Sequence, residues 1–181
     1  MRFGVTCTCV DCGHTFVPED PVYLCPRCGD PAPPIRGLLY MRYPALAEGE
    51  TLPELSAACW LPLLPVIMTD SLPAMRVGRS PLYQRRVEGR EVWLKDDTQN
   101  PTLSYKDRAS AVASAHAREC GRKTIVVAST GNAGSSLAGI CAAQGQRAVV
   151  IVPAAAPEAK LLQALVYGAT VVRVRGTYDD A

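Results

Sequence analysis

Residues 124–132 read Thr-Ile-Val-Val-Ala-Ser-Thr-Gly-Asn and carry the clearest structural signal in the chain. The first five form a continuous apolar run with many β-branched side chains, which is typical of a strand buried on both faces. A short polar loop follows, and the small residues of Asn132–Ala143 then predict a helix that ends before Gly145. A buried strand that passes directly into a helix is the first part of a βαβ unit.

The same alternation continues toward the C-terminus. Ala148–Val152 predicts a second buried strand, Pro157–Tyr167 a helix with proline at its start, and Thr170–Val174 a third strand. This spacing favours an α/β fold, with a three-layer open sheet built from parallel βαβ units. Three parallel strands leave unpaired edges, and residues 176–181 have the composition of a loop. We therefore expect the sheet to be incomplete, part of a longer protein.

Upstream of this sheet the signals are weaker. Lys106–Cys120 is alanine-rich and predicts a helix that ends at Gly121. Prolines interrupt the preceding residues, where we expect a short helix at Leu52–Trp60 and a strand at Val92–Leu94. The sequence thus divides into three expected parts: a cysteine-rich segment at 1–36, a connecting part at 37–100 and an α/β domain at 101–181.

The overall composition excludes several classes of protein. The chain has 181 residues, 48% of them apolar, and a formal net charge of +2, whereas dedicated nucleic-acid binders carry a concentrated basic surface. No apolar run approaches the roughly 20 residues that span a bilayer, and the N-terminus lacks a hydrophobic signal core. We expect a cytoplasmic protein that binds neither nucleic acid nor membranes.

Five of the eight cysteines lie in the first 28 residues. Four of them form two CxxC pairs twelve residues apart, Cys9 with Cys12 and Cys25 with Cys28. Two tight turns that each present two thiolates match tetrahedral Zn²⁺, and the residues between them are expected to form a short hairpin. Zinc would also supply folding free energy that this apolar-poor segment lacks. We therefore predict a zinc-ribbon-like segment with a structural Zn²⁺.

Other interpretations of these cysteines remain open. Cys7 or His14 could replace one of the four ligands, and CxxC pairs also serve redox chemistry or stay idle. A ribbon that binds nucleic acid is disfavoured, because residues 1–36 have three arginines against four acidic residues, a formal charge of −1. The scattered cysteines are expected to be small core residues, namely Cys59, Cys120 and Cys141.

A candidate reactive lysine follows a turn at residues 100–108, which read Asn-Pro-Thr-Leu-Ser-Tyr-Lys-Asp-Arg. Lys106 falls in the first turn of the expected helix, where the positive end of the helix dipole disfavours a further positive charge. Schiff-base chemistry requires the neutral amine as nucleophile. On spacing alone, an ordinary solvated surface lysine is the simpler interpretation.

The loop after the first strand is a candidate ligand site. Ligands of open α/β sheets bind at the carboxyl ends of strands, and Gly131 permits a tight turn there. The helix amides that follow favour an anion. Asn132 either offers its side-chain amide to a ligand or caps the helix. The loop lacks the G-x-G-x-x-G pattern of dinucleotide-binding folds.

Together, the lysine motif and the Ser-Thr-Gly-Asn loop resemble those of threonine synthases, within the fold type II pyridoxal-phosphate (PLP) enzymes. The resemblance extends from Arg79–Leu82 to Thr170–Arg175, and some threonine synthases also carry an N-terminal cysteine cluster. It implies that Lys106 binds PLP as a Schiff base and that Asn132 hydrogen-bonds the cofactor's 3-oxygen. Residues 101–181 would then be a PLP-binding domain.

The resemblance also implies a reaction, the conversion of O-phospho-L-homoserine and water to L-threonine and phosphate, and a homodimer. The implied contacts of the substrate carboxylate are Ser129, Thr130 and Ala133. Those of its phosphate are Lys95, Ser104 and Arg108. The family's glycine-rich loop for the cofactor phosphate and its partner for the pyridine nitrogen would follow Ala181, so we expect these 181 residues alone to be inactive.

The chain departs from the family pattern at several positions. Leu103 stands where glycine is common, Tyr105 where phenylalanine is common, and Ala133 where threonine is common. Arg79–Leu82 replaces a stretch similar to Gly-Gly/Thr-Pro-Leu. Two alternatives therefore stand beside the main hypothesis. One is another fold type II enzyme, a serine/threonine dehydratase or a cysteate synthase-like enzyme; the other is a catalytically inactive zinc-ribbon interaction module.

Overall fold

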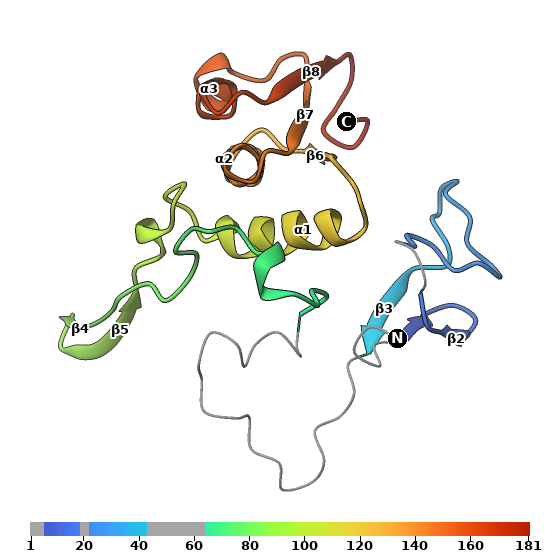
Figure 1. Ribbon diagram of the computed structural model, residues 1–181, viewed down its shortest axis with the longest axis horizontal. Helices are drawn as coiled ribbons and strands as arrows, with labels where there is room; N and C mark the ends of the chain where they lie inside the picture. The colour runs from blue at the N-terminus through green and yellow to red at the C-terminus, as the bar shows by residue number, and fades with distance from the viewer. Residues whose placement is uncertain (1–5, 19–21, 43–63) are drawn as a thin grey trace, which may run out of the picture. The chain divides into compact units, whose positions relative to one another are not determined.

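The computed structural model describes residues 6–18, 22–42 and 64–181 (Figure 1). The chain divides into two compact units, Met1–Ile67 and Met68–Ala181. The helix expected at Leu52–Trp60, including Cys59, lies outside the described residues. No helix in the described ranges is long and apolar enough to cross a membrane.

The first unit contains a small antiparallel sheet with the order β2-β1-β3. Its strands are β1 (Thr6–Cys9), β2 (Thr15–Phe16) and β3 (Leu39–Arg42). We expected the residues between the two CxxC pairs to form a hairpin of their own. Instead β2 pairs with β1, so the hairpin encloses the first CxxC turn. β3 pairs with the other edge of β1, and this sheet therefore extends beyond residue 36.

The second unit begins with a short 3₁₀ helix, η2 (Thr69–Ser71), and an antiparallel hairpin of β4 (Leu82–Val87) and β5 (Arg90–Lys95). The sequence predicted β5 in part and missed β4, because every residue of β4 is exposed and no apolar face marks it. The missed signal is the two-residue turn, in which Glu88 and Gly89 both have positive φ, +49° and +78°, as in a type I′ hairpin.

The prediction that Thr124–Ala128 is buried on both faces is wrong, since none of these residues is buried and Val126 is exposed. The predicted parallel sheet itself is confirmed, with the strand order β6-β7-β8. Its strands are β6 (Thr124–Ala128), β7 (Arg147–Pro153) and β8 (Thr170–Val174). The helices of the unit are η3 (Asp97–Gln99), α1 (Lys106–Glu119), α2 (Asn132–Gln144) and α3 (Glu158–Val166). All three α-helices lie within two residues of the predicted bounds at either end.

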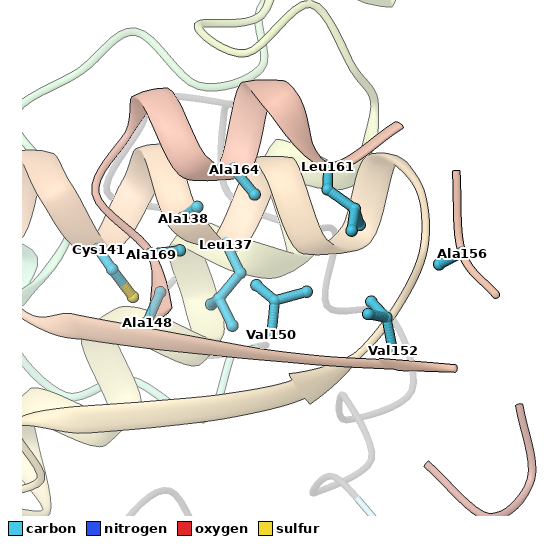
Figure 2. Packing of buried hydrophobic residues seen from close by; sticks show 10 residues of the cluster. All are labelled: Leu137, Ala138, Cys141, Ala148, Val150, Val152, Ala156, Leu161, Ala164 and Ala169. Carbon is cyan, nitrogen blue, oxygen red and sulfur yellow. The ribbon is translucent and has the colours of Figure 1, made fainter. Parts of the chain in front are cut away.

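The core lies between the sheet and the helices α2 and α3, which cover the same face (Figure 2). Side chains of β7 alternate, so that Val150 and Val152 point toward the helices and are buried. Leu137 and Leu161 meet them from α2 and α3. Cys141 is buried in this core as predicted, and α1 packs against α2. The packing fixes the carboxyl end of β6 beside the start of α2.

Candidate functional site

Lys106 is the first residue of α1. The buried Ser104 precedes it, and its Oγ accepts a hydrogen bond from the Lys106 amide at 3.2 Å while its carbonyl accepts one from the Asp107 amide. These bonds satisfy two of the amides that every helix start leaves unpaired. The Lys106 side chain is half-buried, and its Nζ lies 4.8 Å from the centre of the Tyr105 ring. The amine is thus placed over an aromatic face.

Two departures from the family pattern occupy left-handed backbone. Leu103 has φ +63° in a turn closed by its amide on the Asn100 carbonyl, and its side chain is 70% exposed. Arg79 has φ +46°. Non-glycine residues are uncommon in this region, because Cβ crowds the backbone. The chain keeps the backbone conformation that glycine favours while carrying larger side chains.

The Ser-Thr-Gly-Asn loop follows β6. Ser129 is buried; its amide donates to the Ile151 carbonyl, and its Oγ accepts from the Gly131 amide at 3.2 Å. Gly131 is the N-cap of α2, without a side-chain cap, and Asn132 is the first helical residue. Asn132 therefore does not cap this helix, and its exposed carboxamide is accessible to a ligand.

A hollow of about 390 Å³ opens at the start of α2. Its lining residues are Thr130, Gly131, Asn132, Ser135, Ala159 and Gln163. Gln163 of α3 also donates to the Thr102 carbonyl at 3.4 Å, which links the hollow to the loop before Lys106. Lys106 itself is not a lining residue. Ser135 was not predicted as a site residue, although it lies only three residues after Asn132 on α2. Gln163 was missed because only the packing of α3 against α2 brings it to the loop.

The three residues implied as phosphate contacts, Lys95, Ser104 and Arg108, all make hydrogen bonds within the protein. Arg108 forms a two-pronged ion pair with Asp97, with Nη2–Oδ1 at 2.8 Å and Nε–Oδ2 at 3.1 Å. Ser80 also donates to Asp97, and its carbonyl accepts from Lys95 Nζ. The hydrogen bonds from Arg108 and then Ser80 hold the pKa of the Asp97 carboxyl well below its usual range. Lys95 and Arg108 therefore both donate hydrogen bonds to Ser80, whereas the Ser104 hydroxyl accepts one from the Lys106 amide.

The four paired cysteines come together in the first unit. The sulfurs of Cys9, Cys12, Cys25 and Cys28 all lie within 4.8 Å of one another. Cys9–Cys28 is 3.5 Å and Cys12–Cys25 is 3.7 Å. A tetrahedron with Zn–S bonds of about 2.3 Å requires sulfurs about 3.8 Å apart. The Cys12 amide donates to the Cys9 sulfur and is the main reason that the pKa of Cys9 is lowered, whereas hydrogen bonds from the Cys12 and Cys9 sulfurs raise the pKa of Cys28.

Cys7 and His14 do not belong to this cluster. Cys7 is buried in β1, which raises the pKa of its thiol, and His14 stacks on Phe16 with ring centres 5.3 Å apart. A sequence signal that we missed is the glycine after each CxxC pair. Gly13 has φ +68°, and a Cβ on Gly29 would lie 2.5 Å from the Cys25 carbonyl oxygen. Both tight turns therefore depend on glycine.

Residues 74–181 match the family described as pyridoxal-phosphate dependent enzymes. The chain belongs to this family. Threonine synthase from Methanocaldococcus jannaschii is 33% identical over 186 residues, which cover 96% of this chain and 44% of that protein. Threonine synthase from Methanosarcina acetivorans is 32% identical, with 96% and 43% covered. The chain thus spans less than half the length of these curated relatives.

Solved structures agree with the family assignment. A hydrogen sulfide-producing enzyme from Fusobacterium nucleatum has a TM-score of 0.51 at 27% identity, over 55% of this chain and 35% of that one. O-ureido-L-serine synthase has a TM-score of 0.51 at 29% identity, over 55% and 34%. The predicted threonine synthase-like, fold type II PLP family is thereby confirmed, and with it the α/β fold class.

The described residues fit a bound PLP. Lys106 offers an amine at the start of α1, and among the described residues this amine forms no ion pair. The Asn132 carboxamide does not cap α2, and Asn132 lines the hollow. The amides at the start of α2 are suited to an anionic group. An amine, a carboxamide and an anion-binding helix end are part of the donor set that a PLP–amino acid pair requires.

Proposed function

We propose that the whole protein is a lyase of the threonine synthase type, converting O-phospho-L-homoserine and water to L-threonine and phosphate. The observation that carries the proposal is the placement of Lys106 at the start of α1 by the Asn-Pro-Thr-Leu-Ser-Tyr turn. The similarity to curated threonine synthases over 96% of the chain supports this substrate class.

In this proposal Lys106 and Asn132 hold the cofactor, through the amine and through the carboxamide at the 3-oxygen. Bound PLP supplies an electron sink for the α carbon of the substrate. The free Lys106 Nζ then moves protons at the α and β carbons. Overall, the bond between the γ carbon and the phosphate oxygen breaks, the β carbon loses a proton and takes up the oxygen of water, and the γ carbon gains a proton to become the methyl group of threonine.

Substrate recognition is proposed to divide between two surfaces. The carboxylate is held at the start of α2 by Ser129, Thr130 and Ala133, where the backbone amides complement a negative charge. The phosphate is held by Lys95, Ser104 and Arg108. Because Arg108 is paired with Asp97, the phosphate must share this guanidinium with a carboxylate. We therefore expect a weaker phosphate contact from Arg108 than from an unpaired arginine.

The proposal is tested by phosphate release from O-phospho-L-homoserine, using the protein expressed from its complete reading frame. Threonine should appear in step with phosphate. Turnover of serine or phosphoserine without phosphate release from O-phospho-L-homoserine would favour the second candidate, a dehydratase or a cysteate synthase-like enzyme. The likeness to O-ureido-L-serine synthase supports this second candidate function.

We further propose that Cys9, Cys12, Cys25 and Cys28 bind one structural Zn²⁺. The proximity of the four sulfurs supports tetrahedral coordination. Elemental analysis of freshly purified protein should find about one zinc per chain. A content below half an equivalent would contradict the proposal.

A further inference from the structure

A buried carboxylate lies directly after the proposed reactive lysine. Asp107 is 0% exposed and accepts hydrogen bonds from the Thr102 amide (2.7 Å), from Thr102 Oγ1 and from Ser136 Oγ (2.6 Å). Ser136, also 0% exposed, is hydrogen-bonded to Ser110 as well. A buried charge is costly unless it is fully hydrogen-bonded, so this arrangement requires all of these donors to be in place.

These bonds join the three segments that build the candidate site. Thr102 belongs to the turn before Lys106, Asp107 to the first turn of α1, and Ser136 lies one turn after Asn132 on α2. The turn and α2 also approach closely, since a Cβ on Gly139 would lie 2.6 Å from Thr102 Cγ2. Asp107 therefore fixes the start of α1 against the start of α2.

We propose that Asp107 is a positioning residue that sets the placement of Lys106 relative to Asn132. The inference rests on the proposed function, because it assumes that both residues hold one cofactor. The Asp107→Asn variant keeps only one side-chain acceptor oxygen for the Thr102 amide and the Thr102 and Ser136 hydroxyls, so the two helix starts are free to shift. A displacement of about 1 Å costs roughly 100-fold in a reaction that depends on alignment.

The same pair of helices offers a matched control. Ser114 of α1 is 0% exposed and is hydrogen-bonded to Gln144 (2.9 Å) at the far end of α2 and to Gln146 (2.5 Å) just beyond it. Ser114→Ala therefore weakens the packing of α1 on α2 away from Lys106. It tests whether any loss of helix packing has the same effect as loss of Asp107.

The experiment measures how fast added PLP forms the borohydride-reducible adduct with Lys106, in the protein from its complete reading frame. Asp107→Asn should slow this step by ~10-fold or more. The rate of adduct formation in Ser114→Ala should stay within about twofold of the wild-type rate, even if Ser114→Ala lowers the melting temperature as much as Asp107→Asn does. Should Asp107→Asn fail to fold, Ser136→Ala replaces it as a milder loss of the same cluster.

Three results would overturn the inference in distinguishable ways. A wild-type protein that forms an adduct at Lys106, together with an Asp107→Asn variant that forms it at the same rate, refutes the positioning role alone. Equal slowing in Asp107→Asn and Ser114→Ala likewise reduces Asp107 to a stabilising residue. A wild-type protein that forms no adduct at Lys106 refutes the proposed function and this inference together.

Discussion

The two units of the chain differ in the side chains that they bury. In the α/β unit, aliphatic side chains such as Leu137, Val150 and Leu161 are buried between a sheet and two helices. Among residues 6–18 and 22–42, the buried ones are three cysteines, a threonine and a glycine. No aliphatic side chain is buried in these two ranges, where four cysteine sulfurs lie within 4.8 Å of one another. Metal coordination and apolar burial are alternative solutions to the same folding problem.

The largest expected effect is loss of the proposed zinc. Structural zinc sites contribute about 10–16 kcal/mol of binding free energy, which is also folding free energy. Cys25→Ser or a strong chelator should therefore abolish amide-exchange protection in the first unit and leave β6, β7 and β8 protected. Cys7→Ala is the matched control, since Cys7 lies outside the cluster. Protection that survives loss of the metal would mean that other contacts hold this unit.

The converse experiment perturbs the apolar core. Leu137 is 5% exposed in the centre of that core, so Leu137→Ala should lower the free energy of unfolding of the α/β unit by about 2–5 kcal/mol. Zinc content should not change. Denaturant unfolding with parallel metal analysis checks both points. Loss of zinc in this variant would show that the two units depend on one another for folding.

Acidification should affect the Asp97–Arg108 pair. The pKa of Asp97 lies below its usual value when the protein is folded, so the ionised pair stabilises the protein above pH ~4. This contribution is lost as the pH falls toward the folded-state pKa, because the unfolded chain takes up the proton first. Asp97→Asn should therefore make the melting temperature less dependent on pH between about 5 and 2. If the melting temperature of Asp97→Asn depends on pH as strongly as that of the wild type, Asp97 is not the source of this dependence.

The smallest expected effect concerns the turn before Lys106. Leu103 is exposed and has a positive φ, at a cost of about 1–2 kcal/mol that glycine does not incur, although glycine gains entropy in the unfolded chain. Leu103→Gly should therefore stabilise the α/β unit by up to about 1 kcal/mol. Leu103→Ala keeps the strain and serves as the control. Destabilisation by the glycine variant alone would indicate that the leucine side chain makes a useful contact.

The sequence predicted the regular part of the fold well, because β-branched and helix-forming runs mark its elements locally. The runs at β6 and β8 have the same bounds in the structure, although no residue of either strand is buried and Val126 and Val172 are exposed. β4 was missed because its residues are exposed and its partner strand alone defines it. The sheet of the first unit was missed because its strands are short and draw on segments far apart in sequence.

The candidate site was predictable only where a local motif carries the chemistry. Lys106 and Asn132 stand in such motifs, whereas Gln163 of α3 meets Thr102, and Ser136 of α2 meets Asp107 of α1, only through the packing of the helices. The partner of Arg108 was likewise hidden, because Asp97 lies eleven residues earlier in the chain. Side-chain partners that are set by tertiary packing leave no pattern in the sequence around them.

The central claim is that Lys106 is the residue that binds PLP. Its most direct test is to add PLP to the protein from its complete reading frame, reduce the adduct with borohydride and map the labelled peptide. We expect one label on Lys106, absent in Lys106→Ala and unchanged in Lys123→Ala, a lysine outside the candidate site. A label on another lysine, or undiminished labelling of Lys106→Ala, would contradict the account.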